Sequence, residues 1–195
     1  MKKFSKNEII SLAIIFLVLL GVSIPNFVIS LRRARDQVRR DDLGALQHAL
    51  DEYMADFHEL PPASSDGRIM DCVKPGTTVT VDKKGGLVVN LVACNWGVDA
   101  FANLTPGLNK VYMSTLPRDP DYQKGVRYLY FSDGQRYQIL AYMEGGKDEA
   151  DYDPRIVARH VMCGTEVCNV GRAYNAPINI SIEEYDKQIG SQIAK

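Results

Sequence analysis

The sequence predicts an α+β protein in which one long amino-terminal helix packs against a small antiparallel β-sheet. Three observations support this fold class: an uncharged apolar run at Ile9–Leu31, a helical repeat of apolar residues after it, and two alternating segments around an Asp-Gly turn. The chain has 195 residues, so one soluble domain of ordinary size, residues 60–195, remains beyond the helix.

The apolar run is long enough to cross a membrane. A helix rises about 1.5 Å per residue and the bilayer hydrocarbon is about 30 Å thick, so about 20 apolar residues span it. The run reads IISLAIIFLVLLGVSIPNFVISL and carries no charge. It is longer than the apolar region of a cleavable secretory signal, which usually has about 7 to 15 residues. We therefore expect residues 4–31 to form the membrane-spanning half of a helix that stays attached.

The helical pattern continues through residues 32–59, the amphipathic half of the same predicted helix. Apolar residues recur there at steps of three and four, the spacing of one helix face: Leu43, Leu46, Leu50, Tyr53 and Phe57. Both halves therefore form one rod, which Pro61 and Pro62 end because proline disfavours helix before it. Inside the rod, Pro25 removes a backbone donor, so we expect a bend or a locally melted stretch near Gly21–Pro25.

A signature at the amino terminus consists of the order FSKNE, the apolar run and SIPNF. It resembles the amino-terminal signature of type IV pilins and type II secretion pseudopilins. In that family a phenylalanine begins the mature chain, a glutamate follows four residues later, and a proline lies in an Ile-Pro-Asn-Phe setting. Phe4, Glu8 and Pro25 stand at the matching separations. The resemblance implies a pilin-like fold and roles in assembly for these three residues.

The resemblance also implies a function and partners. The protein would be a structural subunit, not an enzyme, which assembles through its amino-terminal helix into a helical filament. Its partners would be copies of itself, other pilins or pseudopilins, an inner-membrane assembly platform and a prepilin peptidase. Residues 1–3 would be a short leader, although Lys3 occupies the place of the glycine after which that peptidase usually cuts. With an uncut leader, Lys3 or Lys6 would replace the amine of Phe4 as the cation for Glu8.

Other functions have less support in the sequence. The alternative is a membrane-anchored extracytoplasmic binding protein that does not polymerise, and an enzyme ranks third. The three histidines, His48, His58 and His160, are scattered, and no HExxH segment, phosphate-binding glycine loop or nucleophile elbow is present. With 23 basic and 24 acidic residues, the near-neutral chain does not favour nucleic acid as the main partner.

The four cysteines help to predict on which side of the membrane the carboxyl-terminal domain lies. We prefer the local disulfides Cys72 with Cys94 and Cys163 with Cys168 to a zinc site, because the spacings do not fit a zinc ribbon. Disulfides favour an extracytoplasmic domain. The positive-inside rule taken literally opposes this orientation, since arginines crowd the segment after the apolar run. Together with the resemblance, the cysteines predict a single-pass protein of the cell membrane with its carboxyl-terminal domain outside the cytoplasm.

Several elements are expected beyond the long helix. Residues 77–82 and 87–93 predict a hairpin, and residues 98–104 a short helix. Residues 126–131 and 136–143 flank an Asp-Gly turn and predict the main hairpin. In its second strand alternate residues should face the long helix, while their neighbours face water: Tyr137, Ile139 and Ala141 are the inward set. Near the end, Ser181 and Glu184 fit a capping box.

Two charged segments allow more than one interpretation. Residues 144–153 are expected to form a solvated acidic loop without a cofactor; weak calcium candidates in it are Glu144, Asp148, Asp151 and Asp153. The arginines between Arg32 and Arg40 would align neighbouring helices or, secondarily, contact anionic lipid.

Overall fold

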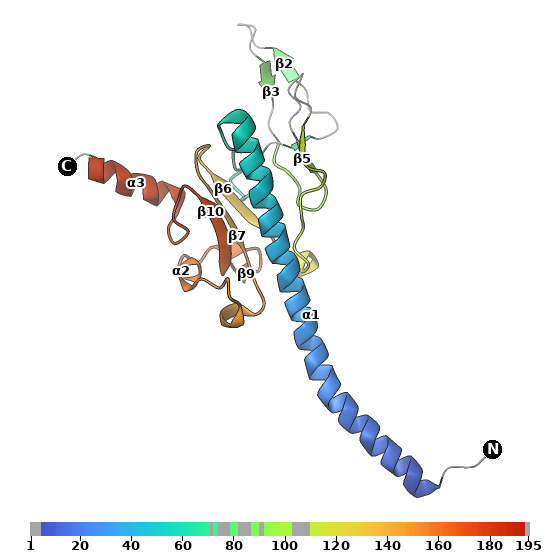
Figure 1. The fold of residues 1–195 in the computed structure, drawn as a ribbon. Helices are drawn as coiled ribbons and strands as arrows, with labels where there is room; N and C mark the ends of the chain where they lie inside the picture. Colours follow the sequence, from blue (N-terminus) through green and yellow to red (C-terminus); the bar gives the residue numbers. More distant parts are fainter. Residues whose placement is uncertain are drawn as a thin grey trace.

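The computed structural model describes residues 5–70, 72–73, 79–81, 87–89, 92–102 and 110–193. A single long helix, α1 (Lys6–Phe57), runs from the amino terminus, and a head domain, residues 60–193, packs against its second half (Figure 1). The strands of the head domain form small antiparallel sheets. The α+β class predicted from the sequence is confirmed.

Helix α1 is continuous over 52 residues. It ends at His58, whose left-handed backbone (φ 56°) lets its N–H donate to the Met54 carbonyl at 2.8 Å. The helix passes through Gly21 and Pro25 without a break, so of the two expected alternatives, a bend or a locally melted stretch, the melted stretch is not found. A proline inside a helix removes one backbone hydrogen bond and favours a bend. Figure 1 shows a curve along α1.

The main sheet contains β6 (Leu129–Ser132), β7 (Tyr137–Ala141) and β10 (Val170–Tyr174), with β7 in the centre. The hairpin of β6 and β7 is confirmed, and the pair of Ser132 with Tyr137 closes its turn. Gly134 in this turn has a φ of 89°, a conformation that glycine adopts without strain. Strand β10 returns on the other side of β7, with Val170 opposite Ala141.

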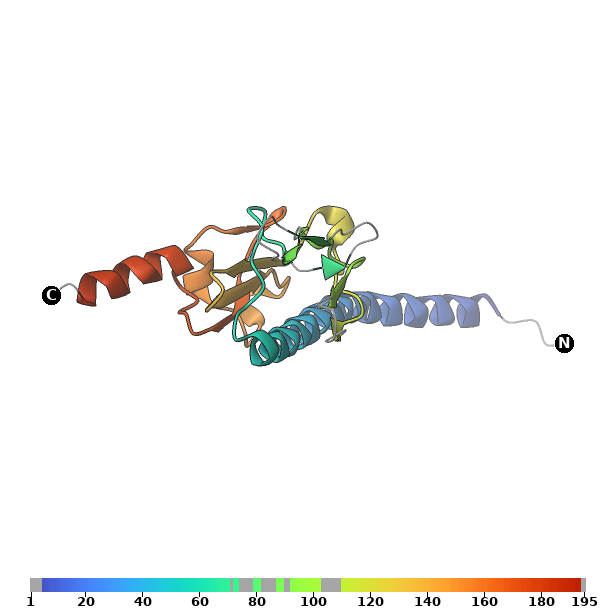
Figure 2. The same cartoon turned by 90° about the horizontal axis from the view of Figure 1, so that it is seen from above.

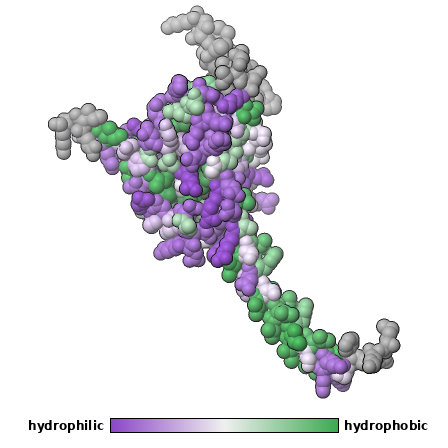
Figure 3. Space-filling view, viewed as in Figure 1, coloured by the Kyte–Doolittle hydropathy of each residue, from purple (hydrophilic) through white to green (hydrophobic). Residues whose placement is uncertain are grey.

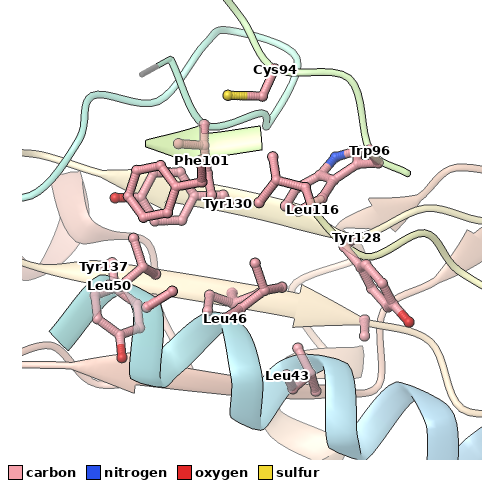
Figure 4. Packing of buried hydrophobic residues seen from close by; sticks show 14 of the residues in the cluster. Leu43, Leu46, Leu50, Cys94, Trp96, Phe101, Leu116, Tyr128, Tyr130 and Tyr137 are labelled. Carbon is pink, nitrogen blue, oxygen red and sulfur yellow. The ribbon is translucent and has the colours of Figure 1, made fainter. Parts of the chain in front are cut away.

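The main core lies between α1 and the sheet. Leu43, Leu46 and Leu50 of the helix are buried against one face of β7, as Figure 4 shows for the side chains around them. Tyr137, Ile139 and Ala141 provide that face, as predicted. Burying each large apolar side chain contributes about 1.5 to 3 kcal/mol, so this contact holds the sheet to the helix.

The opposite face of the sheet differs from expectation. Gln138 and Leu140 were expected to face water, but both are fully buried. The chain after β7 folds back over this face and provides α2 (Pro154–Val157), β8 (Met162–Cys163) and β9 (Glu166–Val167). A second apolar cluster results: Leu129, Leu140, Ile156, Cys163 and Cys168. The sheet is therefore covered on both faces.

A second sheet has the order β1 (Cys72–Val73), β4 (Ala100–Ala102), β5 (Val111–Met113). The prediction of a short helix near residues 98–104 is wrong, because Ala100–Ala102 is a strand, in which Phe101 pairs with Cys72 of β1. Its ring stacks on that of Tyr53 in α1, with centroids 5.3 Å apart. The hairpin of β2 (Val79–Val81) and β3 (Leu87–Val89) is present as predicted.

The remaining elements are short turns and a terminal helix. Two 3₁₀ turns, η1 (Tyr122–Lys124) and η2 (Gly146–Asp148), lie on either side of the main hairpin in sequence. Helix α3 (Ile182–Ile193) projects from the head domain (Figure 2). Its predicted capping box is present, since the N–H of Glu184 donates to Ser181 Oγ and the N–H of Ser181 donates to the Glu184 carboxylate.

Removal of residues 1–31 should leave the head domain folded, because every described residue before Arg32 is exposed. We expect the truncated chain in plain buffer to melt within about 3 °C of the full chain in detergent, a shift that corresponds to about 1 kcal/mol. Thermal melts followed by circular dichroism measure this. A control that removes residues 1–42 also loses the buried Asp36 and Arg39 and should not fold. A 32–195 chain without a cooperative transition would contradict the expectation.

Candidate assembly helix and its charged junction

The first half of α1 is an exposed apolar shaft. Its large apolar side chains between Ile9 and Leu31 are 38% to 66% exposed, with Leu20 the least and Leu17 the most exposed. The most apolar window of α1 has a mean hydropathy of 2.6 and no buried residue. Figure 3 shows this shaft leaving the hydrophilic head domain. By length and composition α1 can cross a membrane, and it is the one such helix in the described ranges.

Glu8 belongs to a capping box at the start of the shaft. The N–H of Ser5 donates to the Glu8 carboxylate at 2.7 Å, and the N–H of Glu8 donates to Ser5 Oγ at 3.3 Å. Glu8 is exposed and, within the residues that the structure describes, forms no ion pair. In a single chain the carboxylate therefore caps its own helix. Phe4 lies outside the described residues.

Pro25 lies in the same exposed half of α1 as Glu8. The two positions are 17 residues apart, which corresponds to about 25 Å along the helix axis. Pro25 and Glu8 are therefore too far apart to contact each other within one chain. The structure thus brings two of the three predicted assembly residues onto one uncovered segment.

A charged junction joins α1 to the head domain where the shaft ends. It consists of two fully buried charged residues of α1, Asp36 and Arg39, and the charged side chains that surround them. The members of the charged junction are Arg35, Asp36, Arg39, Arg40, Asp119, Asp121, Glu144, Glu149 and Asp151.

Arg39 is the centre of the charged junction. Its Nε and Nη2 donate to the two oxygens of Asp119 at 2.8 and 3.0 Å. Nη2 also donates to Asp121 at 2.8 Å, while Nη1 donates to Asp36 at 2.7 Å and to Glu144 at 3.0 Å. Burial alone would lower the pKa of Arg39, but the hydrogen bonds and charges of these carboxylates raise it. Arg39 is therefore a permanently charged buried group with carboxylates around it.

Asp36 fixes the chain that follows β7. Its two carboxylate oxygens accept the N–H groups of Glu144 and Gly145, both at 2.9 Å. Since a buried backbone N–H without a partner costs about 1 to 3 kcal/mol, these bonds determine where the acidic loop starts. Asp119 acts in the same way on the segment before η1, because its Oδ1 accepts the N–H of Asp121 at 2.7 Å.

The acidic loop is neutralised by the arginines of α1. Arg35 donates to both oxygens of Glu144, each at 2.6 Å, and hydrogen bonds to that carboxylate raise the pKa of Arg35. Arg40 donates to Asp151 at 2.6 Å and also pairs with Glu149. These arginines therefore bind the acidic loop of their own chain. From the sequence they were expected to align neighbouring helices or to contact anionic lipid.

The calcium candidates do not come together. Glu144 and Asp151 pair with different arginines, Asp148 lies 3.9 Å from Arg32, and Asp153 caps α2 through the N–H of Arg155. The described part of the chain has no group of three or more His, Cys, Asp or Glu side chains placed to hold a metal ion. The acidic loop is solvated only in part, because Glu144, Glu149 and Asp151 pair with arginines of α1, whereas the side chain of Asp148 is 78% exposed. Sequence reasoning missed this junction.

The four cysteines form two disulfides, Cys72–Cys94 and Cys163–Cys168, the pairing preferred from the sequence. The first joins β1 of the second sheet to the chain before Trp96, and the second closes the β8–β9 turn over the main sheet. Both bonds belong to buried parts of the head domain and are remote in sequence from the shaft.

Replacement of Arg39 by methionine should destabilise the protein by about 3 to 5 kcal/mol, because Asp36 and Asp119 remain buried without their cation. Urea unfolding of the full chain in detergent at pH 7 measures the loss. The matched control is Arg33→Met, at an exposed position of the same helix, which should change stability by less than about 0.5 kcal/mol. Equal stability of the two variants would contradict the junction's role.

Acidification should weaken the protein through Asp121. Burial opposes its charge, but hydrogen bonds from Lys124 and Arg39 lower its pKa to about 2. A carboxyl whose folded pKa lies below its unfolded value of about 3.9 stabilises the fold above that pH, and this contribution is lost as the pH falls from about 4 to 2. Burial raises the pKa of Asp42, which acts in the opposite direction.

The change Asp121→Asn isolates this effect. We expect the free energy of unfolding of the variant to fall less between pH 4 and pH 2 than that of the unchanged chain. Urea unfolding at a series of pH values provides the comparison. Two parallel profiles would show that Asp121 is not the group responsible.

Comparisons with known proteins give no relative. No protein-family model matches the chain, and no curated protein or solved structure matches it significantly.

Proposed function

We propose that this protein is a pilin-like structural subunit that is anchored in the membrane by the shaft of α1 and assembles through it into a helical filament. The single observation that carries the proposal is the uncovered apolar half of α1, whose most apolar window has no buried residue. A shaft of this kind needs an apolar environment, which lipid or the shafts of other copies provide.

The energy of burial favours an apolar environment for the shaft, whether that is lipid or the shafts of other copies. Apolar side chains of this size contribute about 1.5 to 3 kcal/mol each when they leave water. In a bilayer lipid covers them already, so packing and paired polar groups decide whether shafts associate. A contact in which one copy packs against a different surface of the next produces a helical filament when the repeated rotation does not close into a ring.

The charged junction supports the proposal because it fixes the head domain to the helix. Arg39 and Asp36 connect α1 to two separate segments of the head domain, at Asp119 and at Glu144. When shafts pack in a regular array, a head domain held in this way is placed regularly as well. A freely hinged head would not transmit that order.

Glu8 is proposed to control assembly. A carboxylate at the end of an apolar segment is costly when neighbouring helices exclude water, unless a cation faces it. The capping bond from Ser5 is exposed and is the interaction that an intermolecular partner must replace. The amine of Phe4, or Lys3 or Lys6 in an uncut chain, from a neighbouring copy would be that cation.

The amino-terminal resemblance supports a place in a type IV pilus or a type II secretion pseudopilus. Other pilins or pseudopilins, an inner-membrane assembly platform and a prepilin peptidase are the proposed partners, with the head domain and its disulfides outside the cytoplasm. The alternative function is a membrane-anchored binding protein that does not polymerise.

The variant Glu8→Gln should abolish filaments while leaving the protein in the membrane, because it removes the charge and keeps the size of the side chain. Filaments are measured by electron microscopy and immunoblotting of sheared cell fractions. The matched control is Glu183→Gln, at an exposed position of α3, and it should assemble normally. Absence of filaments from the unchanged protein would favour the anchored binding protein, and normal filaments from Glu8→Gln would remove Glu8 from the mechanism.

A further inference from the structure

An unassigned pocket lies in the head domain between the turn at residues 95–99 and the segment that leads into β6. Its volume is about 480 Å³, within the range of about 300 to 1,000 Å³ that is typical of small-molecule sites. We call it the arginine pocket, and its characteristic lining residues are Arg68, Trp96, Val98, Arg118, Tyr122 and Arg127. None of these residues belongs to the shaft or to the charged junction.

The walls of the pocket are held in place by specific contacts. Arg68 has its Nε 2.8 Å from Asp66, and its Nη1 donates to the Asn95 side-chain oxygen at 3.0 Å. Gly97, with a φ of 75°, lies against Arg118, and a Cβ at this glycine would stand 2.7 Å from the Cβ of Arg118. The absence of a side chain at position 97 therefore allows the arginine to pack closely on the turn.

The pocket has three arginines and one carboxylate among its lining residues, so it carries net positive charge. Asp66 neutralises Arg68, but Arg118 and Arg127 are exposed and have no carboxylate partner among the residues that the structure describes. The guanidinium carbon of Arg118 lies 5.1 Å from the centroid of the Tyr122 ring, which orients it by a cation–π contact. Two guanidinium groups at one pocket favour an anion such as a carboxylate, which accepts two parallel hydrogen bonds from one guanidinium and a further hydrogen bond from a second.

The other lining residues indicate the chemical class of the ligand more specifically. Asn95 also lines the pocket, and its side-chain amide group suits a hydroxyl group of a ligand. Val98 and Trp96 offer apolar surface, which suits the C–H face of a ring. We propose that the arginine pocket binds a carboxylate-bearing saccharide of one or two sugar units, with Arg118 and Arg127 on the carboxylate. This proposal does not depend on filament assembly.

Equilibrium dialysis of the full chain in detergent micelles against sodium glucuronate tests the proposal. Saturable binding is expected, and the double variant Arg118→Gln/Arg127→Gln should weaken it by roughly tenfold or more. The matched control removes two exposed cations elsewhere, with Arg155→Gln and Lys187→Gln, and should bind as the unchanged chain does. A lack of saturable binding, or equal affinity of the pocket variant and the unchanged chain, would overturn the proposal.

Two further ligands define the chemistry. Glucose, which lacks the carboxylate, should bind at least tenfold more weakly than glucuronate, and so should inorganic phosphate, which lacks the sugar ring. Equal binding of either compound would overturn the assignment of a carboxylate-bearing saccharide. Trp96 is the single tryptophan of the chain, so a change in its emission with glucuronate but not with glucose is a second expected result.

Discussion

The buried guanidinium of Arg39 is the interaction on which the arrangement of helix and head domain depends. An unpaired charge out of water costs several kcal/mol, so the fold is stable only where Asp36, Asp119 and Glu144 meet this group together. An apolar contact tolerates a shift along the helix much better than such a cluster does. The charged junction therefore fixes the axial position of the head domain.

The two halves of α1 consequently have different roles in one continuous helix. From Asp36 onward one face is buried by the head domain, whereas every residue from 5 to 31 is exposed. The proposed function uses this division. The second half of α1 and the charged junction position the head domain, and the shaft provides the apolar surface for the membrane and for other copies. The arginine pocket lies apart from both and gives the head domain a proposed binding role of its own.

The sequence predicted what depends on local patterns. The long helix, the Asp-Gly hairpin and the inward set on β7 each have a short-range repeat or turn signal. The strand at Ala100–Ala102 lacked one, because it is only three residues long, too short for an alternating pattern, and it pairs with both Cys72–Val73 and Val111–Met113. The burial of Gln138 was hidden because a polar residue in an alternating strand suggests an outward position. The charged junction pairs arginines of α1 with carboxylates that lie 80 to 111 positions away in the sequence, so no local pattern predicted these pairs. One signal was available: Asp36 and Arg39 continue the helical face of Leu43 and Leu46.

The proposed filament requires that other copies of the chain cover the shaft. Photocrosslinking in intact cells from a benzoylphenylalanine placed at Leu17, the most exposed of its large apolar positions, measures what covers it. We expect a ladder of products at multiples of the 21.8 kDa chain mass. Crosslinks to lipid alone, with the protein always at the mass of one chain, would contradict it.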